Sequence, residues 1–359
     1  MVVRIFHNLN VLLWNYIKMK INIISGQKGF TLIELMVAIV LGLIITAAAI
    51  QLFITGQASV NLQRGMADLQ DSGNFGLRYI SNDIRKANYG NVNIVNDRLA
   101  NGGIVLTSRF TPSRPTSATT FTDANISVNM NIKSGATPPV AVQVPLTTFA
   151  TGSSNVKINT TDQGSDQLVV QFYADQAGID CEGNAYTANR YIVERFFLRT
   201  DSNSASNEPN AALALACEAG SYVGDTATNI LKNPISSTTV FGTTGGEILI
   251  RRVDHLHFLL GISNDNNSGD LRYIPINTYL ALNQNPRPRV NAVQIGMLIR
   301  SSESVKERTL ISDSQTFNVL DQTVNVKVPT GTPPKYLRRV VTQTIALRNA
   351  LISTDAAVM

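Results

Sequence analysis

The sequence predicts an α+β protein in which a long N-terminal helix packs on an antiparallel β-sheet domain. Three patterns carry this prediction. Residues 35–54 contain no charged side chain, residues 62–84 repeat apolar side chains every three or four positions, and beyond residue 88 short runs of Val, Ile and Phe are bounded by Gly, Pro, Asn or Ser. These patterns are typical of a membrane-length helix, an amphipathic helix and β-strands, respectively.

The first element is an apolar helix, and Leu35–Ile54 is its uncharged stretch. Twenty helical residues span about 30 Å, the thickness of the hydrocarbon core of a bilayer. The segment before the helix has basic side chains and no acid, namely Arg4, Lys18, Lys20 and Lys28. Because a basic flank favours the cytoplasmic side, we expect the rest of the chain to be exported.

The second element continues this helix with one apolar face. Its apolar positions are Leu62, Met66, Leu69, Leu77, Ile80 and Ile84, with Gly73 and Gly76 between them. No proline occurs from residue 30 to residue 109, so one helix of about 55 residues is compatible with the sequence. Glycines at 42, 56, 65, 73 and 76 predict bends or melted turns, and two helices broken near Gly56 are the alternative.

Beyond residue 88, the sequence predicts a set of short β-strands. The expected strands are residues 103–107, 126–132, 140–144, 167–173, 191–198, 247–253, 255–262, 293–300, 324–328 and 337–348. In the last of these, alternate residues suit a half-buried antiparallel strand. Tracts rich in Ser, Thr and Asn at 108–125, 145–165, 199–210 and 224–246 are interpreted as exposed loops.

These elements divide the chain into four segments. They are a basic N-terminal leader, a transmembrane helix, an amphipathic continuation at 56–87 and a periplasmic β-rich domain at 88–359, with Met19 as a second start within the leader. The resemblance of the motif described below implies that the leader is 1–29 and the transmembrane helix 30–55. The chain has 30 basic and 25 acidic residues, and removing the four basic residues of the leader leaves 26 against 25. This near balance gives no reason to expect direct nucleic-acid binding.

Cys181 and Cys217 are the two cysteines, and both lie on the side expected to be exported. An even pair in an oxidising compartment predicts a disulfide. By loop-closure entropy a bond across this 36-residue separation stabilises the fold by roughly 3–4 kcal/mol. Two free buried thiols, or a metal pair, are the alternatives.

One motif, Lys28-Gly29-Phe30-Thr31-Leu32-Ile33-Glu34-Leu35, runs directly into the apolar helix. It resembles the processing and methylation signature of type IV prepilins and of the related pseudopilins of type II secretion. The resemblance implies that a prepilin peptidase cuts after Gly29 and methylates the new amino terminus of Phe30. A carboxylate in a membrane span costs roughly 2.5–3.5 kcal/mol, and the resemblance implies that Glu34 is neutralised by the amino terminus of a neighbouring subunit.

Four further patches narrow the resemblance: Asp180–Gly183, Leu215–Cys217, Val293–Ser301 and Leu337–Asn349. Their order and spacing are similar to the PilW family of type IV pilus minor pilins. The resemblance implies a type IV pilin-like fold and a role in priming pilus assembly at or near the tip. It further implies roles in piliation, twitching motility, adhesion or DNA uptake.

The implied partners are other minor pilins, a tip adhesin of the PilY type, the major pilin, the inner-membrane assembly platform and the prepilin peptidase. The implied location is the inner membrane, with a single span and a cytoplasmic N-terminus, and later the pilus fibre. A J-type minor pseudopilin of type II secretion is one alternative. A membrane-anchored periplasmic enzyme or binding protein is another.

Other candidate sites are weaker. Asn264–Asp270 is rich in oxygen ligands, but only Asp265 and Asp270 carry a charge, so an asparagine-rich turn is favoured over a calcium loop. His255 and His257 would share one face of a strand without a third histidine for zinc. We find no phosphate-binding loop, nucleophile elbow or zinc-protease motif, so neither a catalytic residue nor a cofactor is predicted.

Overall fold

The structure, a computed structural model, describes the chain in several stretches. These are residues 29–90, 102–108, 124–126, 146–204, 208–223, 241, 245–263, 271–282, 287–305, 311–312, 314–328 and 334–347. The chain forms two compact units, which meet in sequence between Ser59 and Val60. The boundary lies within helix α2 (Leu32–Ile84), so each unit contains one part of that helix.

In the first unit, the described residues form the apolar part of α2. Its large side chains are exposed to an unusual degree: Leu35 is 55% exposed, Leu43 65% and Leu52 76%. This part is long and apolar enough to cross a membrane, and none of its most apolar stretch is buried within the chain. Its apolar surface therefore has no partner among the described residues.

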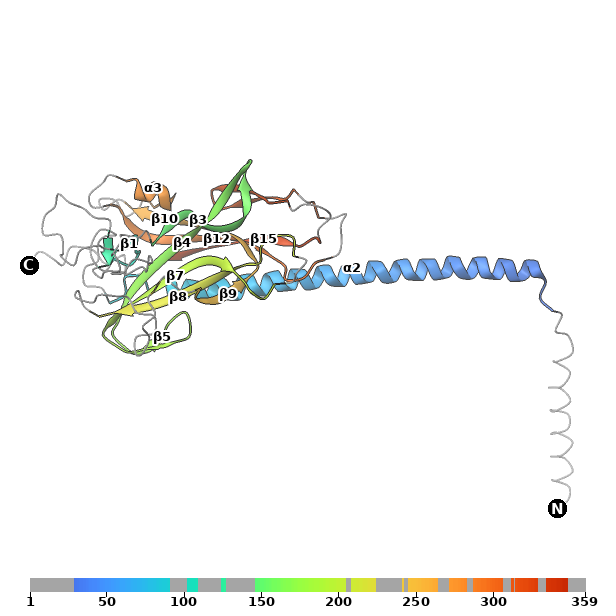
Figure 1. The fold of residues 1–359 in the computed structure, drawn as a ribbon, viewed down its shortest axis with the longest axis horizontal. Coiled ribbons are helices and arrows are strands. Elements are labelled where there is room, and N and C mark those ends of the chain that lie inside the picture. Colours follow the sequence, from blue (N-terminus) through green and yellow to red (C-terminus); the bar gives the residue numbers. More distant parts are fainter. Residues whose placement is uncertain are drawn as a thin grey trace, which may run out of the picture. The chain divides into compact units, whose positions relative to one another are not determined.

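Helix α2 is a single helix of 53 residues (Figure 1). The alternative of two helices broken near Gly56 is wrong, and no melted turn interrupts the helix at its glycines. Met66 is 54% exposed rather than packed. The buried stripe contains the expected Leu69, Leu77, Ile80 and Ile84, together with Gly65, Gly73 and Gly76.

Three glycines of this stripe let the helix backbone approach the strands closely. A Cβ added at Gly65 would lie 3.1 Å from the Leu337 side chain, and one at Gly73 would lie 3.0 Å from Val341. At Gly76 the added Cβ would come within 2.1 Å of Ile250. The close packing outweighs the low helix propensity of glycine, which explains why the helix continues through these positions.

The second unit contains a seven-stranded sheet in the order β13-β14-β3-β4-β7-β8-β9. Figure 1 labels β3, β4, β7, β8 and β9 of this sheet. Every pairing in it is antiparallel. Its strands are β3 (Thr148–Ile158), β4 (Thr161–Ala174), β7 (Arg190–Thr200), β8 (Leu213–Tyr222), β9 (Glu247–Arg251), β13 (Thr316–Val319) and β14 (Gln322–Val326). The described fold is thus the expected α+β arrangement.

A second, four-stranded antiparallel sheet has the order β11-β10-β12-β15. Its strands are β10 (Val253–Ser263), β11 (Arg272–Pro275), β12 (Arg289–Arg300) and β15 (Arg338–Ala346), and the short helix α3 (Ile276–Leu280) follows β11. Two small pairs complete the described elements: β1 (Thr107–Ser108) with β2 (Ala124–Ile126), and β5 (Gly178–Ile179) with β6 (Ala185–Tyr186).

Most of the expected strands within the described residues are confirmed, but several regions differ from the expectation. The expected strand at 103–107 is an isolated bridge from Ile104 to Val170 followed by the two-residue β1, and β11 and β13 were not expected. The expected strand at 140–144 lies outside the described residues. The tract 145–165 was expected to be a loop, whereas it forms β3 and the start of β4. Thr and Ser on the polar side of a half-buried strand hide its period, since only Val156 among the larger apolar residues of β3 is fully buried. Strand β8 was not expected because all ten of its residues are buried, so its sequence of mostly small residues lacks the alternation of apolar and polar side chains that marks a half-exposed strand.

The main core lies between the two sheets and the buried stripe of α2. It combines Ile80 and Ile84 of the helix with Phe196 and Leu215 of the larger sheet and Phe258, Ile295 and Met297 of the smaller one. A separate apolar cluster joins Leu298 of β12 to Val319 and Val324 of the β13–β14 hairpin. The hairpin thus covers the face of the smaller sheet that points away from α2.

Candidate processing and assembly site

The candidate site lies at the beginning of α2, where Gly29, Phe30 and Thr31 precede the first helical residue, Leu32. Phe30 is 84% exposed, and a Cβ added at Gly29 would meet nothing within 4 Å. The Gly29–Phe30 peptide bond is therefore open to an enzyme that binds this segment. No described residue packs over it.

Glu34 takes part in the cap of the helix. The backbone N–H of Glu34 donates to Thr31 Oγ1 at 3.2 Å, and the Thr31 hydroxyl lies 3.5 Å from Glu34 Oε2. This is the Thr-x-x-Glu pattern of a capping box, in which a carboxylate also interacts favourably with the positive end of the helix dipole. Sequence reasoning had explained Glu34 only by an external partner; the spacing from Thr31 to Glu34 was the signal for a local role.

The two cysteines are joined in the expected disulfide, with their Cα atoms 6.1 Å apart. Cys217 lies in the middle of β8, and Cys181 lies in the segment between β5 and β6. The carbonyl of Cys181 accepts a hydrogen bond from the Tyr79 hydroxyl at 3.3 Å. The disulfide therefore connects the larger sheet to a loop that contacts the last turns of α2.

Glu194 lies beside this disulfide and is fully buried. Its Oε1 accepts the backbone N–H of Cys181 at 3.0 Å. Burial raises the pKa of Glu194 to about 8, Asp83 adds to this effect, and Lys86 opposes it. A carboxyl at this position is therefore largely protonated near neutral pH, which suits a buried structural group.

His255 and His257 form a buried cluster in which their rings stack with centroids 6.4 Å apart, so both do lie on one face of β10. His257 Nδ1 is 2.6 Å from Asp166 and Nε2 is 2.7 Å from Asp321, while His255 Nε2 is 3.0 Å from Gln322. Within the described residues no metal-binding group of three such side chains forms. The candidate calcium residues Asp265 and Asp270 lie outside the described residues.

A buried ion network joins the corner where β9 leads into β10 to the ends of β12 and β15. Its members are Arg252, Arg300, Arg338, Asp201, Glu208 and Asp254. Arg252 contacts both Asp201 and Glu208 at 2.8 Å, and Arg338 Nε lies 2.7 Å from Asp254. Arg300 and Arg338 belong to two of the sequence segments on which the PilW resemblance rests. They lie on β12 and β15, which are neighbouring strands.

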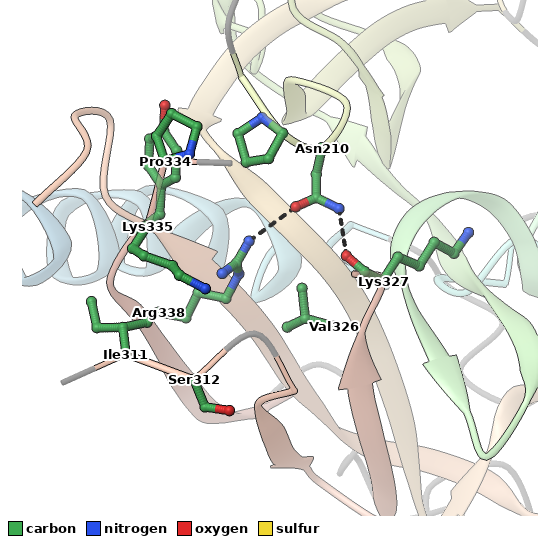
Figure 2. A pocket seen from close by; sticks show the side chains of 10 residues that line it. Asn210, Ile311, Ser312, Val326, Lys327, Pro334, Lys335 and Arg338 are labelled. Atoms are coloured by element: carbon green, nitrogen blue, oxygen red, sulfur yellow. Dashed lines mark hydrogen bonds between the residues drawn. The ribbon is translucent and has the colours of Figure 1, made fainter. Parts of the chain in front are cut away.

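A small cavity of about 20 Å³ lies beside this network, between the ends of β14 and β15 (Figure 2). Asn210 links its sides, since its Nδ2 donates to the Lys327 carbonyl at 2.8 Å and its Oδ1 accepts from Arg338 Nη2 at 3.3 Å. A volume of this size holds about one water molecule. This cavity is part of the packing and has no room for a substrate.

The fold and the site define a class of protein. A capped, apolar helix of membrane length begins at the Gly-Phe-Thr-Leu-Ile-Glu motif and continues into a β-domain, as in type IV pilins. Residues 24–50 match the family described as Prokaryotic N-terminal methylation motif. Residues 222–349 match the family described as Type IV Pilus-assembly protein W. Together, these two matches support a type IV pilus minor pilin of the PilW family.

Two of the four resembling patches, Val293–Ser301 and Leu337–Asn349, lie inside the matched range. Among curated proteins none matches the chain. Among solved structures, a type IV-like pilin from Thermus thermophilus is similar over 79% of this chain and 96% of its own length, at 10% identity and a TM-score of 0.32. At this TM-score the likeness does not define the fold class, which rests on the described helix and strands. The apolar helix and the motif fit anchoring in the inner membrane and incorporation into a pilus.

Proposed function

We propose that this minor pilin primes pilus assembly and is incorporated at or near the pilus tip, in support of piliation, twitching motility, adhesion or DNA uptake. Residues 1–29 act as a leader, with Met19 as an alternative start, and the segments 30–55, 56–87 and 88–359 act as membrane helix, amphipathic continuation and periplasmic domain. The peptidase cuts between Gly29 and Phe30 and methylates Phe30. The protein's role is structural and needs no catalytic residue of its own.

One observation carries the proposal: the processing motif opens a helix whose apolar side chains have no partner among the described residues. From Leu35 to Ile54 the large apolar side chains are more than half exposed. Such a surface requires a lipid or protein environment supplied from outside. A helical bundle of pilin subunits replaces the membrane as that environment once the subunit is extracted.

Glu34 supports the same proposal, because its carboxylate stands at the exposed start of this helix. Within a bundle of apolar helices a lone carboxylate is costly, and the positively charged amino terminus of a neighbouring subunit offers compensation. The proposed partners of the assembled subunit are the other minor pilins, a tip adhesin of the PilY type, the major pilin and the inner-membrane platform. In the membrane we expect a cytoplasmic N-terminus.

The mass of the N-terminal peptide, measured on protein from its native cells, tests the first step of this proposal. We expect a chain that begins at N-methylated Phe30 and, in cells without the peptidase, a chain that still carries its leader. A chain that begins at Met1 or Met19 in peptidase-competent cells would contradict the pilin pathway. It would leave a membrane-anchored periplasmic enzyme or binding protein as the remaining interpretation.

The J-type minor pseudopilin of type II secretion shares the same processing chemistry, so a separate measurement is needed to distinguish it. Deletion of the gene should abolish surface pili and leave the amount of secreted enzymes unchanged. The opposite result would assign the protein to the secretion system. The PilW match of residues 222–349 is the observation that favours the pilus.

A further inference from the structure

A cavity of about 330 Å³ lies in the second unit, where α2 passes the corner between β9 and β10. One side consists of helix residues between Asp68 and Gly76, and the other consists of the continuous run Ile248–Arg252. Arg300 and Ser302, at the end of β12, close the third side. Its volume lies within the range of sites that bind small ligands or the side chains of a partner.

One wall of this cavity is apolar and exposed. Phe75 is 75% exposed although it belongs to the half of α2 that packs on the domain. Ile248 and Leu249 face the cavity as partly buried side chains. An exposed aromatic side chain beside partly buried aliphatic ones is the composition of an interface anchor.

The polar wall carries an excess of positive charge. Three of the lining residues are Arg251, Arg252 and Arg300, and Asp68 is the one lining acid. Asp68 is already engaged, since its Oδ2 accepts the N–H of Ser302 at 2.8 Å and the Ser302 hydroxyl at 2.7 Å.

Behind the cavity, Arg252, Arg300 and Arg338 form ion pairs with Asp201, Glu208 and Asp254, so the buried charges balance. The two charged residues of the lining outside these pairs are Arg251 and Asp68. The Arg251 side chain is 55% exposed and lies 3.8 Å from Asp201. The exposed Arg251 guanidinium can therefore reach a carboxylate that arrives from outside.

The cavity also follows the open edge of a sheet. Strand β9 ends the seven-stranded sheet and, within the described part of the chain, pairs with β8 on one side only. Side chains alternate along a strand, so a cavity lined by the four consecutive β9 residues Ile248–Arg251 reaches the backbone edge as well as one face. Such an edge can pair with an extended segment of another protein.

We propose that this groove binds an extended peptide segment of a partner protein that carries a bulky apolar side chain next to a carboxylate. The apolar side chain packs against Phe75 and Leu249, and the carboxylate pairs with Arg251. The backbone of the segment aligns with β9. This interaction involves only the second unit and is independent of the processing and assembly steps proposed above.

A peptide-binding measurement on the full-length chain in detergent micelles tests the inference. The probe is a fluorescent hexapeptide of alternating valine and aspartate that ends in phenylalanine, and its partner has asparagine in place of aspartate. We expect fluorescence anisotropy to show binding of the acidic peptide and at least tenfold weaker binding of the amide version. Phe75→Ser and Arg251→Glu should each weaken the acidic peptide at least tenfold.

Two matched variants serve as controls. Arg272→Glu reverses an exposed arginine on β11, and Ile179→Ser removes a side chain that is 64% exposed on β5. Both should bind the acidic peptide as the unaltered chain does. Because Phe75 and Arg251 are exposed, circular dichroism should show that their variants remain folded.

Three results would overturn the inference. They are absence of binding at millimolar peptide, equal binding of the acidic and amide peptides, and equal weakening by the control and groove variants. Self-association of the chain that is lost on Arg251→Glu, measured by analytical ultracentrifugation, would also overturn it, since the occupant would then be a second copy. None of these results bears on cleavage at Gly29, so the two proposals fail independently.

Discussion

The two parts of α2 belong to one helix but have opposite surroundings. In the first part Leu43 is 65% and Leu52 is 76% exposed, whereas in the second part Leu69 is 4% exposed and Ile80 is fully buried. The first part is apolar on all sides, as a helix surrounded by lipid or by other helices must be. The second is apolar along one stripe because the partner of that stripe is in the same chain. The difference separates residues that we propose serve assembly from residues that serve folding.

The glycines show the same difference at single positions. A Cβ added at Gly42 or Gly56 would meet nothing within 4 Å, whereas at Gly65, Gly73 and Gly76 it would meet side chains of β9, β15 or the segments beside them. In the second part glycine is required by close packing. In the first part, no described residue packs closely enough against Gly42 or Gly56 to require glycine there.

The largest effect is expected from removing the charge of Glu34. Glu34→Gln keeps the size of the side chain and removes the group proposed to pair with a neighbouring amino terminus. We expect incorporation into fibres to fall below detection, while the thermal denaturation of the second unit is unchanged. Immunoblots of sheared fibres and of membranes from complemented cells would measure the first effect.

Two variants sharpen the Glu34 result. Thr31→Val removes the capping hydroxyl and retains the carboxylate, so it should cost about 1 kcal/mol of helix stability and leave incorporation intact. Glu247→Gln neutralises an exposed acid of the second unit and should have no effect on assembly. If Thr31→Val and Glu34→Gln were equally defective, the cap rather than the charge would explain the role of Glu34.

The next largest effect concerns the disulfide, which belongs only to the folded domain. Cys181→Ser together with Cys217→Ser removes a cross-link between residues 36 positions apart. By loop-closure entropy the free energy of unfolding should fall by about 3–4 kcal/mol. Urea denaturation would measure the loss, and treatment of the unaltered chain with reductant should reproduce it. Equal stability of the oxidised and reduced chains would contradict this expectation.

The sequence was most informative where one residue type repeats or where a motif is local. The apolar stretch from Leu35 to Ile54 predicted a membrane-length helix, and the order of residues from Gly29 to Glu34 predicted the class of protein. Pairing of Cys181 with Cys217 followed from their number and their expected compartment. None of these inferences required knowledge of contacts between distant residues.

The parts that sequence reasoning missed depend on such contacts. The strand at Thr148–Ile158 was hidden by its polar residues, and the buried role of Gly76 becomes visible only beside Ile250. The ion network likewise assembles Arg252, Arg300 and Arg338 from separate strands. Single charges spaced far apart in a sequence carry no signal that they will be buried together.

Gly76→Ala gives a direct test of the contrast between the two parts of the helix. The added methyl group would lie 2.1 Å from the Ile250 side chain, which is 2% exposed and has little room to move. Overpacking of this kind costs about 1–3 kcal/mol, and a gain of about 1 kcal/mol in helix propensity offsets part of it. Gly56→Ala, with only the propensity gain, should not lower stability. In an Ile250→Ala background, Gly76→Ala should no longer destabilise, and a persistent loss there would show that Ile250 is not the cause.

The smallest effect is expected from the pH dependence of the His257 cluster. Burial opposes the charged form of His257, but hydrogen bonds and charge interactions with Asp166 and Asp321 outweigh it and raise its pKa above the ordinary value. A raised pKa means that this contribution to stability is complete below about pH 6.5 and is lost as the pH rises through the folded pKa. Burial lowers the pKa of His255 to about 4, so between about pH 6.5 and pH 4 this second histidine destabilises the folded chain as the pH falls.

Asp321 is 43% exposed, so its loss should cost only about 1 kcal/mol. Asp321→Asn should therefore lower stability slightly at pH 6 and weaken the decline in stability as the pH rises above about 6.5. Denaturation curves at several pH values would measure both effects, and an unchanged slope in the variant would show that Asp321 does not hold the proton on His257.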